Sequence, residues 1–161
     1  MTATEIFALT LRAEAGDRPV RALEALAALV VNRARLAAEG AASRARFAPG
    51  GTAAGWVALL PPVCRAPFLF GCWNPRHPNR RALLAALRDQ TTPSGGALPE
   101  ARPDLLLEVC RRIAGRAAAG ALPDPTLGAT HWHDAAEMPG WAIGHVPTAE
   151  VGGLVFYRLA A

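Results

Sequence analysis

The apolar run from Val20 to Val31 restricts the fold more than any other stretch of this chain. Its apolar side chains recur at helical spacing, so they form one wide stripe along a helix. The stripe consists of Leu23, Leu26, Ala27, Leu29, Val30 and Ala34. Pro19 suits the first turn of this helix, and Gly40 suits its end. We therefore predict a long central core helix that ends near Gly40.

A shorter helix is predicted immediately before the central one. Thr2 and Glu5 have the spacing of a capping box, so this first helix begins near residue 3. Gly16 is the residue type expected just after a helix end, where a left-handed conformation is needed. Glu14 therefore falls in the last turn of the first helix, directly before the buried one.

The later elements are read from Pro, Gly and Asn positions and from changes in apolar spacing. They are a loop over 40–56, a short helix over 56–60 stopped by Pro61 and Pro62, an aromatic loop over 63–75, a helix over 80–90 capped by Asn79, a linker over 91–99 and a helix over 103–120. Two β-type runs, 129–133 and 153–158, are expected to pair as antiparallel strands. We predict one domain over residues 1–161, mainly α (α+β), with a small antiparallel sheet near the C-terminus.

The composition is that of a globular protein, because 52% of the 161 residues are hydrophobic and 19% are charged. No uncharged apolar run reaches the roughly 18 residues that a membrane span needs, so no stable membrane association is expected. The N-terminus lacks the basic start and unbroken apolar stretch of a secretory signal, which predicts a cytoplasmic location. We also expect a monomer.

The formal net charge of +4 favours a polyanionic partner, either nucleic acid or an anionic cell wall. The arginines are spread over several segments, with no aromatic-interleaved nucleic-acid motif among them. Nucleic acid is therefore not the expected partner. The three cysteines form no Cys-x-x-Cys motif. Cys64 and Cys72 either pair across a tight loop or remain buried free thiols.

Glu14 is the main candidate for chemistry. At the negative end of a helix, and partly buried, a carboxyl group is disfavoured in its ionised form. A carboxyl that keeps its proton can act as a general acid. The alternative is a solvated glutamate that pairs with Arg12 or Arg18, and position by itself favours this alternative.

Other polar and aromatic residues are candidates for binding. Asn32 lies inside the apolar run, so its amide needs partners, and we expect it to tie the central helix to a loop. The aromatic loop residues Phe70, Trp73 and Asn74 either contact sugar rings or pack in the core. His131 and His133 share one strand face and are expected either to line a cleft or to satisfy local hydrogen bonds. His145 or Asp134 can add a third metal ligand, but no recognised zinc spacing is present, so no metal is predicted.

Four segments, in this order and spacing, resemble the cell wall hydrolase family typified by the spore cortex-lytic enzyme SleB. They are Glu14-Ala15 with Ala-Ala-Leu-Val-Val-Asn-Arg at 27–33, Val63-Cys64 with Phe-Gly-Cys-Trp-Asn-Pro at 70–75, Asp-Pro-Thr-Leu-Gly-Ala-Thr-His-Trp-His at 124–133, and Pro-Gly-Trp at 139–141 with Gly-Gly-Leu-Val-Phe-Tyr-Arg at 152–158. The resemblance covers nearly the whole chain. Leu69 and Gly71 stand where similar proteins usually have Gln and Ser.

The resemblance implies a lysozyme-like fold and cleavage of the β-1,4 bond between N-acetylmuramic acid and N-acetylglucosamine in peptidoglycan. The family's catalytic glutamate falls on Glu14. The residues expected to bind substrate are Phe70, Trp73, Asn74, Thr130, His131, His133 and Tyr157, and those expected to be structural are Asn32 and Arg33. No cofactor is expected.

Ordinary glycosidases use two carboxylates. Here no second acid occupies a fixed motif position, and Glu24, Asp89 and Asp134 are loose candidates only. One acid suits a lytic transglycosylase, in which the sugar's own hydroxyl attacks. The expected setting is a phage-type endolysin that a holin releases to the periplasm and cell wall. Two rivals are a zinc-dependent amidase or peptidase using the histidines and a non-catalytic wall-binding module.

Overall fold

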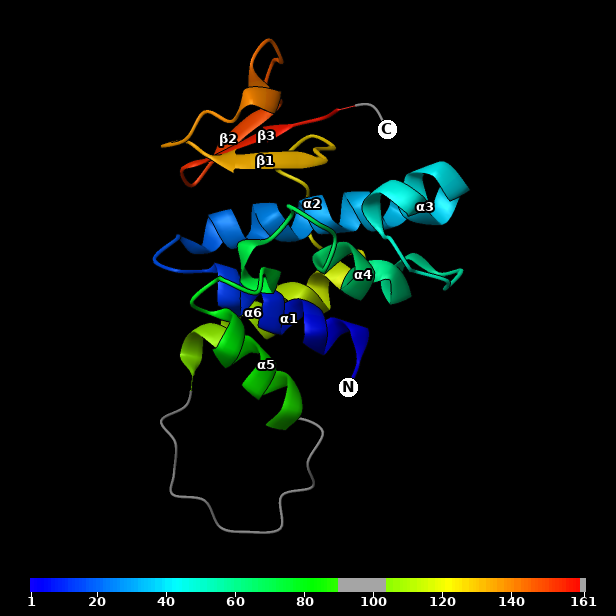
Figure 1. The fold of residues 1–161 in the computed structure, drawn as a ribbon, viewed down its shortest axis with the longest axis vertical. Helices are drawn as coiled ribbons and strands as arrows, with labels where there is room; N and C mark the ends of the chain where they lie inside the picture. Colours follow the sequence, from blue (N-terminus) through cyan, green and yellow to red (C-terminus); the bar gives the residue numbers. More distant parts are fainter. Residues whose placement is uncertain (90–103, 160–161) are drawn as a thin grey trace.

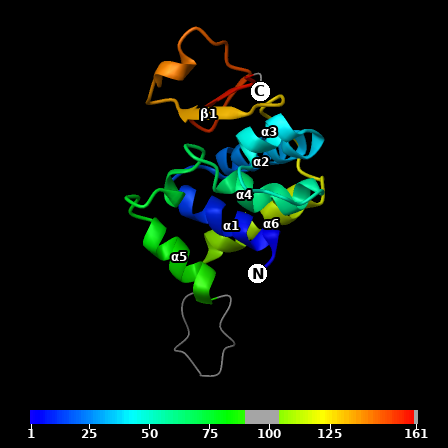
Figure 2. The ribbon, with the colours of Figure 1, turned by 45° about the vertical axis from the view of Figure 1, so that its right-hand side comes forward.

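The computed structural model of the chain describes residues 1–89 and 104–159. In these residues six α-helices precede a three-stranded antiparallel sheet with strand order β1-β3-β2. Figure 1 shows the sheet at one end of the molecule, with helix α2 lying between it and helices α1, α4 and α6. The turned view in Figure 2 keeps this order of layers. The prediction of a mainly helical chain with a small sheet near the C-terminus is confirmed.

The first two helices follow the predicted pattern. Helix α1 spans Ala3–Glu14, and the Thr2 hydroxyl accepts a hydrogen bond from the Glu5 N–H at its start. Gly16 has the expected left-handed conformation, with a φ of +52°. Helix α2 spans Val20–Glu39. Pro19 was predicted in the first turn of α2, but it is the residue immediately before that turn.

Helix α2 is the centre of the hydrophobic core. All six residues of its predicted stripe are fully buried, and its neighbours Ala22, Ala25 and Ala28 are buried as well. Arg21, Arg35 and Glu39 of α2 are exposed, so other elements cover most of this helix and leave part of its surface to solvent. The largest fully buried side chains elsewhere in the described residues are Phe7, Leu11, Phe47, Leu59, Leu60, Val63, Leu154 and Phe156.

Two predictions between the second helix and the aromatic loop are wrong. The segment predicted as a loop contains helix α3, Ala41–Phe47, whose Ala and Arg residues favour a helix and whose Phe47 is buried. The 3₁₀ turn η1, Trp56–Leu59, continues into helix α4, Leu60–Cys64. Pro61 and Pro62 therefore lie in the first turn of α4, where a missing N–H breaks no helical bond.

The helices on either side of the linker are only partly described. Helix α5 spans Arg80–Asp89, and helix α6 spans Leu105–Ala118. The predicted helix end at Gln90, the linker over 91–99 and the helix start at Pro103 lie outside the described residues. The Asp104 carboxylate caps α6 by accepting the Leu107 N–H at 3.0 Å.

The predicted strands pair as expected. Strand β1, His131–Asp134, pairs antiparallel with β3, Leu154–Tyr157, with His131 opposite Tyr157 and Asp134 opposite Leu154. A third strand, β2, Ala149–Val151, pairs with the other edge of β3 and was not predicted. Three residues are too few to give a recognisable alternation of apolar and polar side chains.

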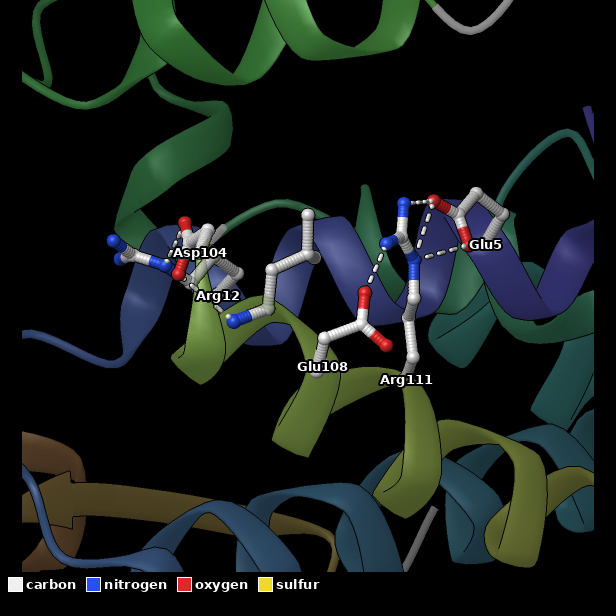
Figure 3. A network of polar contacts seen from close by, with 6 residues as sticks. Glu5, Arg12, Asp104, Glu108 and Arg111 are labelled. Atoms are coloured by element: carbon white, nitrogen blue, oxygen red, sulfur yellow. Dashed lines mark hydrogen bonds and ion pairs between the residues drawn. The ribbon is translucent and has the colours of Figure 1, made fainter. Parts of the chain in front are cut away.

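Ion pairs line the edge of the contact between α1 and α6 (Figure 3). Arg111 donates to Glu5 at 2.8 Å and to Glu108 at 2.6 Å. Arg12 donates to Asp104 at 2.8 Å. These side chains are partly exposed, so water and salt weaken their attraction.

We expect the change Arg111→Gln to lower the free energy of unfolding by only about 0.5–1 kcal/mol, because such pairs are worth little at a surface. The loss should shrink in about 1 M salt, where charges are screened within a few ångströms. Urea unfolding at low and high salt measures both effects. Arg112→Gln, on the exposed side of α6, is the matched control and should change stability little at either salt concentration.

All three cysteines are buried free thiols, which decides between the two alternatives for Cys64 and Cys72. Burial raises the pKa of the Cys64 thiol to about 12 and also raises that of Cys72. Thiols with such pKa values stay protonated and are poor nucleophiles.

Within residues 1–89 and 104–159, none of the helices combines the length and apolar character needed to cross a membrane.

Candidate active site

Glu14 is the last residue of α1, and its side chain is buried, with only 7% of the residue exposed. The carboxylate oxygen Oε1 accepts a hydrogen bond from the backbone N–H of Cys72 at 2.5 Å. Cys72 lies in the 3₁₀ turn η2, Gly71–Trp73, inside the aromatic loop. The carboxyl group is thus held between a helix end and this loop.

The solvated, paired glutamate considered as the alternative is not what the structure contains. Arg12 is bonded to Asp104, and Arg18 donates to the backbone carbonyl oxygen of Glu14. Neither arginine bonds the Glu14 carboxylate. Its second oxygen, Oε2, has no hydrogen-bond partner in the described part of the chain. This oxygen is also not completely buried, so solvent can reach it. That oxygen is therefore available to a ligand.

Arg18 connects the Glu14 end of α1 to the sheet. Its guanidinium carbon lies 5.5 Å from the centre of the Trp132 ring, and Nη2 is 3.9 Å from the Asp134 carboxylate. Trp132 in turn donates its indole N–H to the carbonyl oxygen of Leu69, which lies within the aromatic loop. Three parts of the chain that are distant in sequence therefore meet near Glu14.

His77 is a neighbour of Glu14 that sequence reasoning missed. A Cβ atom added to Gly71 would lie 3.1 Å from the His77 ring and 3.7 Å from Glu14 Oε1, so both side chains face the α-carbon of Gly71. His77 Nδ1 accepts the Asn79 N–H at 3.2 Å, which leaves Nε2 to carry the proton of the neutral ring. A histidine two residues after the Asn74-Pro75 pair of the aromatic segment is the sequence signal that could have marked it.

The predicted ligands of the aromatic loop have different environments. Phe70 is buried and lies 6.3 Å from the Trp132 ring, centre to centre. Trp73 is partly buried, with the Arg65 guanidinium 4.9 Å from its ring centre. Asn74 is exposed, and its side-chain oxygen accepts the Arg76 N–H.

The predicted residues of the sheet form a second cluster. His133 Nδ1 donates to the Asp134 carbonyl oxygen, and its Nε2 lies 3.0 Å from the Tyr157 hydroxyl. Thr130 is buried, and its hydroxyl contacts His131 Nδ1 at 2.8 Å. Trp141, in the 3₁₀ turn η3, Gly140–Ala142, lies 5.3–5.7 Å from the rings of three of these residues, centre to centre.

No group of three or more His, Cys, Asp or Glu side chains in the described residues is arranged to hold a metal ion. Both ring nitrogens of His133 already have protein partners. The zinc-dependent alternative therefore finds no ligand set in that part of the molecule.

The candidates for a second acid lie in different surroundings. Glu24 forms an ion pair with Arg116 at 3.1 Å, whereas Asp134 faces Arg18, the neighbour of Glu14. The side chain of Asp89 is not described.

Asn32 and Arg33 connect α2 to the segment that leads into β1. Asn32 donates to the Asp124 carboxylate at 2.9 Å and to the Ala129 carbonyl oxygen at 3.1 Å. Arg33 Nε donates to the Thr130 carbonyl oxygen at 2.6 Å. These bonds fix the sheet against the central helix and so fix the position of β1 relative to the site.

Asp124 organises the same segment. Burial alone would raise the pKa of Asp124, but bonds from Thr126, Asn32 and Gly128 outweigh it and hold the pKa below the ordinary value. A carboxylate whose pKa is lowered by folding stabilises the fold above its unfolded pKa, and this contribution is lost as the pH falls through the folded pKa.

We therefore expect Asp124→Asn to lower the free energy of unfolding by about 1 kcal/mol at neutral pH. The difference from wild type should shrink as the pH falls from the unfolded pKa of about 3.9 through the lower folded pKa, because the wild-type carboxyl then becomes protonated as well. Urea unfolding across this pH range is the measurement. Glu137→Gln, an exposed substitution in the β1–β2 connection, is the control. A difference for Asp124→Asn that stays constant with pH would contradict the assignment.

No protein-family model, curated protein or solved structure matches this chain. Its function therefore has to be inferred from the residues of the site. The central feature is one buried carboxyl group with an available oxygen, near a histidine and aromatic side chains and without a bonded cation.

Proposed function

We propose that this protein is a peptidoglycan hydrolase of the SleB type, with Glu14 as its catalytic acid. The bond cleaved is the β-1,4 bond between N-acetylmuramic acid and N-acetylglucosamine. The observation that carries the proposal is the buried Glu14 carboxyl group, which accepts the Cys72 N–H through one oxygen and has the other available.

In the proposed reaction, protonated Glu14 donates its proton to the glycosidic oxygen as the bond to the muramyl carbon breaks. Positive charge develops on the muramyl ring, and the carboxylate that remains stabilises it at short range. The C6 hydroxyl of the same sugar then attacks the carbon, and Glu14 takes back a proton. The products are a free N-acetylglucosamine hydroxyl and a 1,6-anhydro muramyl end. A single carboxyl group completes this cycle, which fits a lytic transglycosylase.

The surroundings of Glu14 support a glycan substrate. Trp73 and Trp132 are partly exposed, whereas Phe70 is buried. Aromatic rings such as those of the two tryptophans suit the apolar faces of sugars. The net charge of +4 favours an anionic polymer. We further propose action as a phage-type endolysin, which predicts that expression lyses cells only when a pore-forming holin is also made.

The test is digestion of purified peptidoglycan sacculi with mass spectrometry of the soluble products. The expected products carry 1,6-anhydro-N-acetylmuramic acid ends and appear equally in the presence of a strong chelator. Reducing muramyl ends would show hydrolysis by water in place of transglycosylation. Free stem peptides that require metal would identify an amidase or peptidase. Binding to sacculi with no soluble product would show a wall-binding module.

A further inference from the structure

His77 and Glu14 share the space above one glycine of the 3₁₀ turn η2. A Cβ atom built on Gly71 would lie 3.4 Å from Nε2 of His77 and 3.7 Å from Oε1 of Glu14. The same atom would lie only 3.1 Å from Cδ2 of His77, so a side chain at Gly71 would crowd the imidazole ring. Gly71 itself is exposed. A ligand that lies over this glycine can therefore contact the carboxyl group and the imidazole together.

Hydrogen bonds hold the segment around His77 against the end of helix α1. The Asn79 side chain donates to the Ala13 carbonyl oxygen at 2.8 Å, and Ala13 is the residue before Glu14. The Arg80 guanidinium donates to a carbonyl oxygen of η2, the turn whose Cys72 N–H bonds the Glu14 carboxylate. His77 and Glu14 therefore belong to one framework, although 63 positions separate them in the chain.

The local hydrogen bonds also decide which ring nitrogen of His77 is the donor. Nδ1 accepts the Asn79 backbone N–H at 3.2 Å, so the proton of the ring is on Nε2. A doubly protonated ring would place two N–H donors against each other at this contact. Nε2 has no hydrogen-bond partner in the part of the chain that the structure describes, and His77 is partly exposed. A neutral His77 therefore presents an unused N–H donor beside Gly71.

An uncharged donor at this position suits an uncharged, oxygen-rich ligand. Sugar rings carry hydroxyl and N-acetyl carbonyl oxygens, and both kinds of oxygen accept hydrogen bonds. A cationic group would instead favour the ionised form of a neighbouring carboxyl group and so oppose its use as an acid. A neutral imidazole can hold the sugar without this effect.

We propose that His77 is a substrate-binding residue of the Glu14 site, and that its Nε2–H donates a hydrogen bond to an oxygen of the sugar held against Glu14. The inference rests on the proposed function, because the ligand is the same glycan strand. A hydrogen bond from a second segment restricts how the sugar can turn relative to the acid, which is the contribution that His77 makes. The proton that is transferred belongs to Glu14.

Two substitutions of His77 separate this role from a purely structural one. In His77→Gln the side-chain amide nitrogen can take the place of Nε2, so the donor to the sugar is kept and the acceptor for the Asn79 N–H is lost. In His77→Asn the shorter amide can take the place of Nδ1, so that acceptor is kept and the donor to the sugar is lost. A structural role predicts that His77→Gln is the more damaging change, and the proposal predicts the opposite.

The measurement is the affinity for soluble, uncut strands of alternating N-acetylglucosamine and N-acetylmuramic acid, by calorimetry in a Glu14→Gln background. His77→Asn should weaken binding about tenfold, and His77→Gln by no more than about threefold. Arg81→Gln, an exposed change on α5, is the control and should bind like the background protein. Unchanged affinity in His77→Asn, or a larger loss in His77→Gln than in His77→Asn, would overturn the proposal.

Nitrogen NMR of the unsubstituted protein gives a second readout that needs no folded variant. The His77 ring should be neutral with its proton on Nε2, and the Nε2 signal should shift when the strands are added. A proton on Nδ1, or no shift at saturation, would overturn the proposal.

The two proposals can fail separately, because neither binding experiment depends on cleavage. Digestion of sacculi by the wild type, together with unchanged affinity in His77→Asn, would keep the proposed function and remove the role of His77. Strand binding that depends on the His77 donor, without digestion by the wild type, would keep the binding role and contradict the proposed function.

Discussion

Glu14→Gln is expected to lower the rate of peptidoglycan digestion by about 10²–10⁴-fold. The amide has nearly the shape of the acid but cannot donate its proton to a glycosidic oxygen. Its carbonyl oxygen can still accept the Cys72 N–H, so the contact between α1 and the aromatic segment is retained. Turbidity loss of purified sacculi measures the rate, and thermal unfolding checks that the variant is folded.

Two companion variants make the Glu14 result specific. Glu150→Gln, on the exposed position of β2, should leave the rate unchanged. Asp134→Asn removes the carboxylate nearest to Arg18 on the sheet and should reduce the rate far less than Glu14→Gln. A loss as large as that of Glu14→Gln would indicate a second catalytic carboxylate. Folded Glu14→Gln with wild-type activity would rule out Glu14 as the acid.

Gly152→Ala is expected to destabilise the fold by about 2–5 kcal/mol. Gly152 lies in the turn between β2 and β3 at a φ of +59°, where a side chain adds strain. A Cβ atom there would lie 2.7 Å from the Cβ and 3.2 Å from the Cα of Ala22. Ala22 is a fully buried residue of the first turn of α2, so the helix backbone cannot easily move away.

Gly153→Ala is the matched control for the steric part of this prediction. Its φ of +83° is also left-handed, but a Cβ atom there meets nothing within 4 Å. Only the backbone strain remains, so the expected loss is about 1 kcal/mol. Urea unfolding of both variants gives the comparison. Equal losses would show that the turn is not pressed against α2.

The positions of α1 and α2 could be predicted because their signals are local. A helical hydrogen bond joins residues four apart, so apolar spacing, caps and Gly16 specify these helices within a short window. The same logic placed Glu14 at a helix end. It did not predict α3, because seven residues are too few to show a helical pattern of apolar side chains. It also missed that Pro61 and Pro62 begin a helix, which depends on the 3₁₀ turn before them.

The environment of Glu14 depends on contacts between distant segments. Its carboxylate is bonded to a residue 58 positions away, and the bond between Asn32 and Asp124 spans 92 positions. The spacing of residues within a short window does not predict such long-range contacts, because they follow from how whole helices pack. The relation of His77 to Glu14 was missed for this reason, since only the fold brings Glu14 to the Gly71 position that His77 also faces.

The sequence alone therefore determined the central helix, the helix end that carries Glu14 and the two β-type runs that pair as strands. The tertiary structure decided which atoms surround that carboxyl group and which arginines are bonded elsewhere. The physical reason is that hydrogen bonds within a helix are set by neighbours in the chain. Burial and charge at a site are set by every element packed around it.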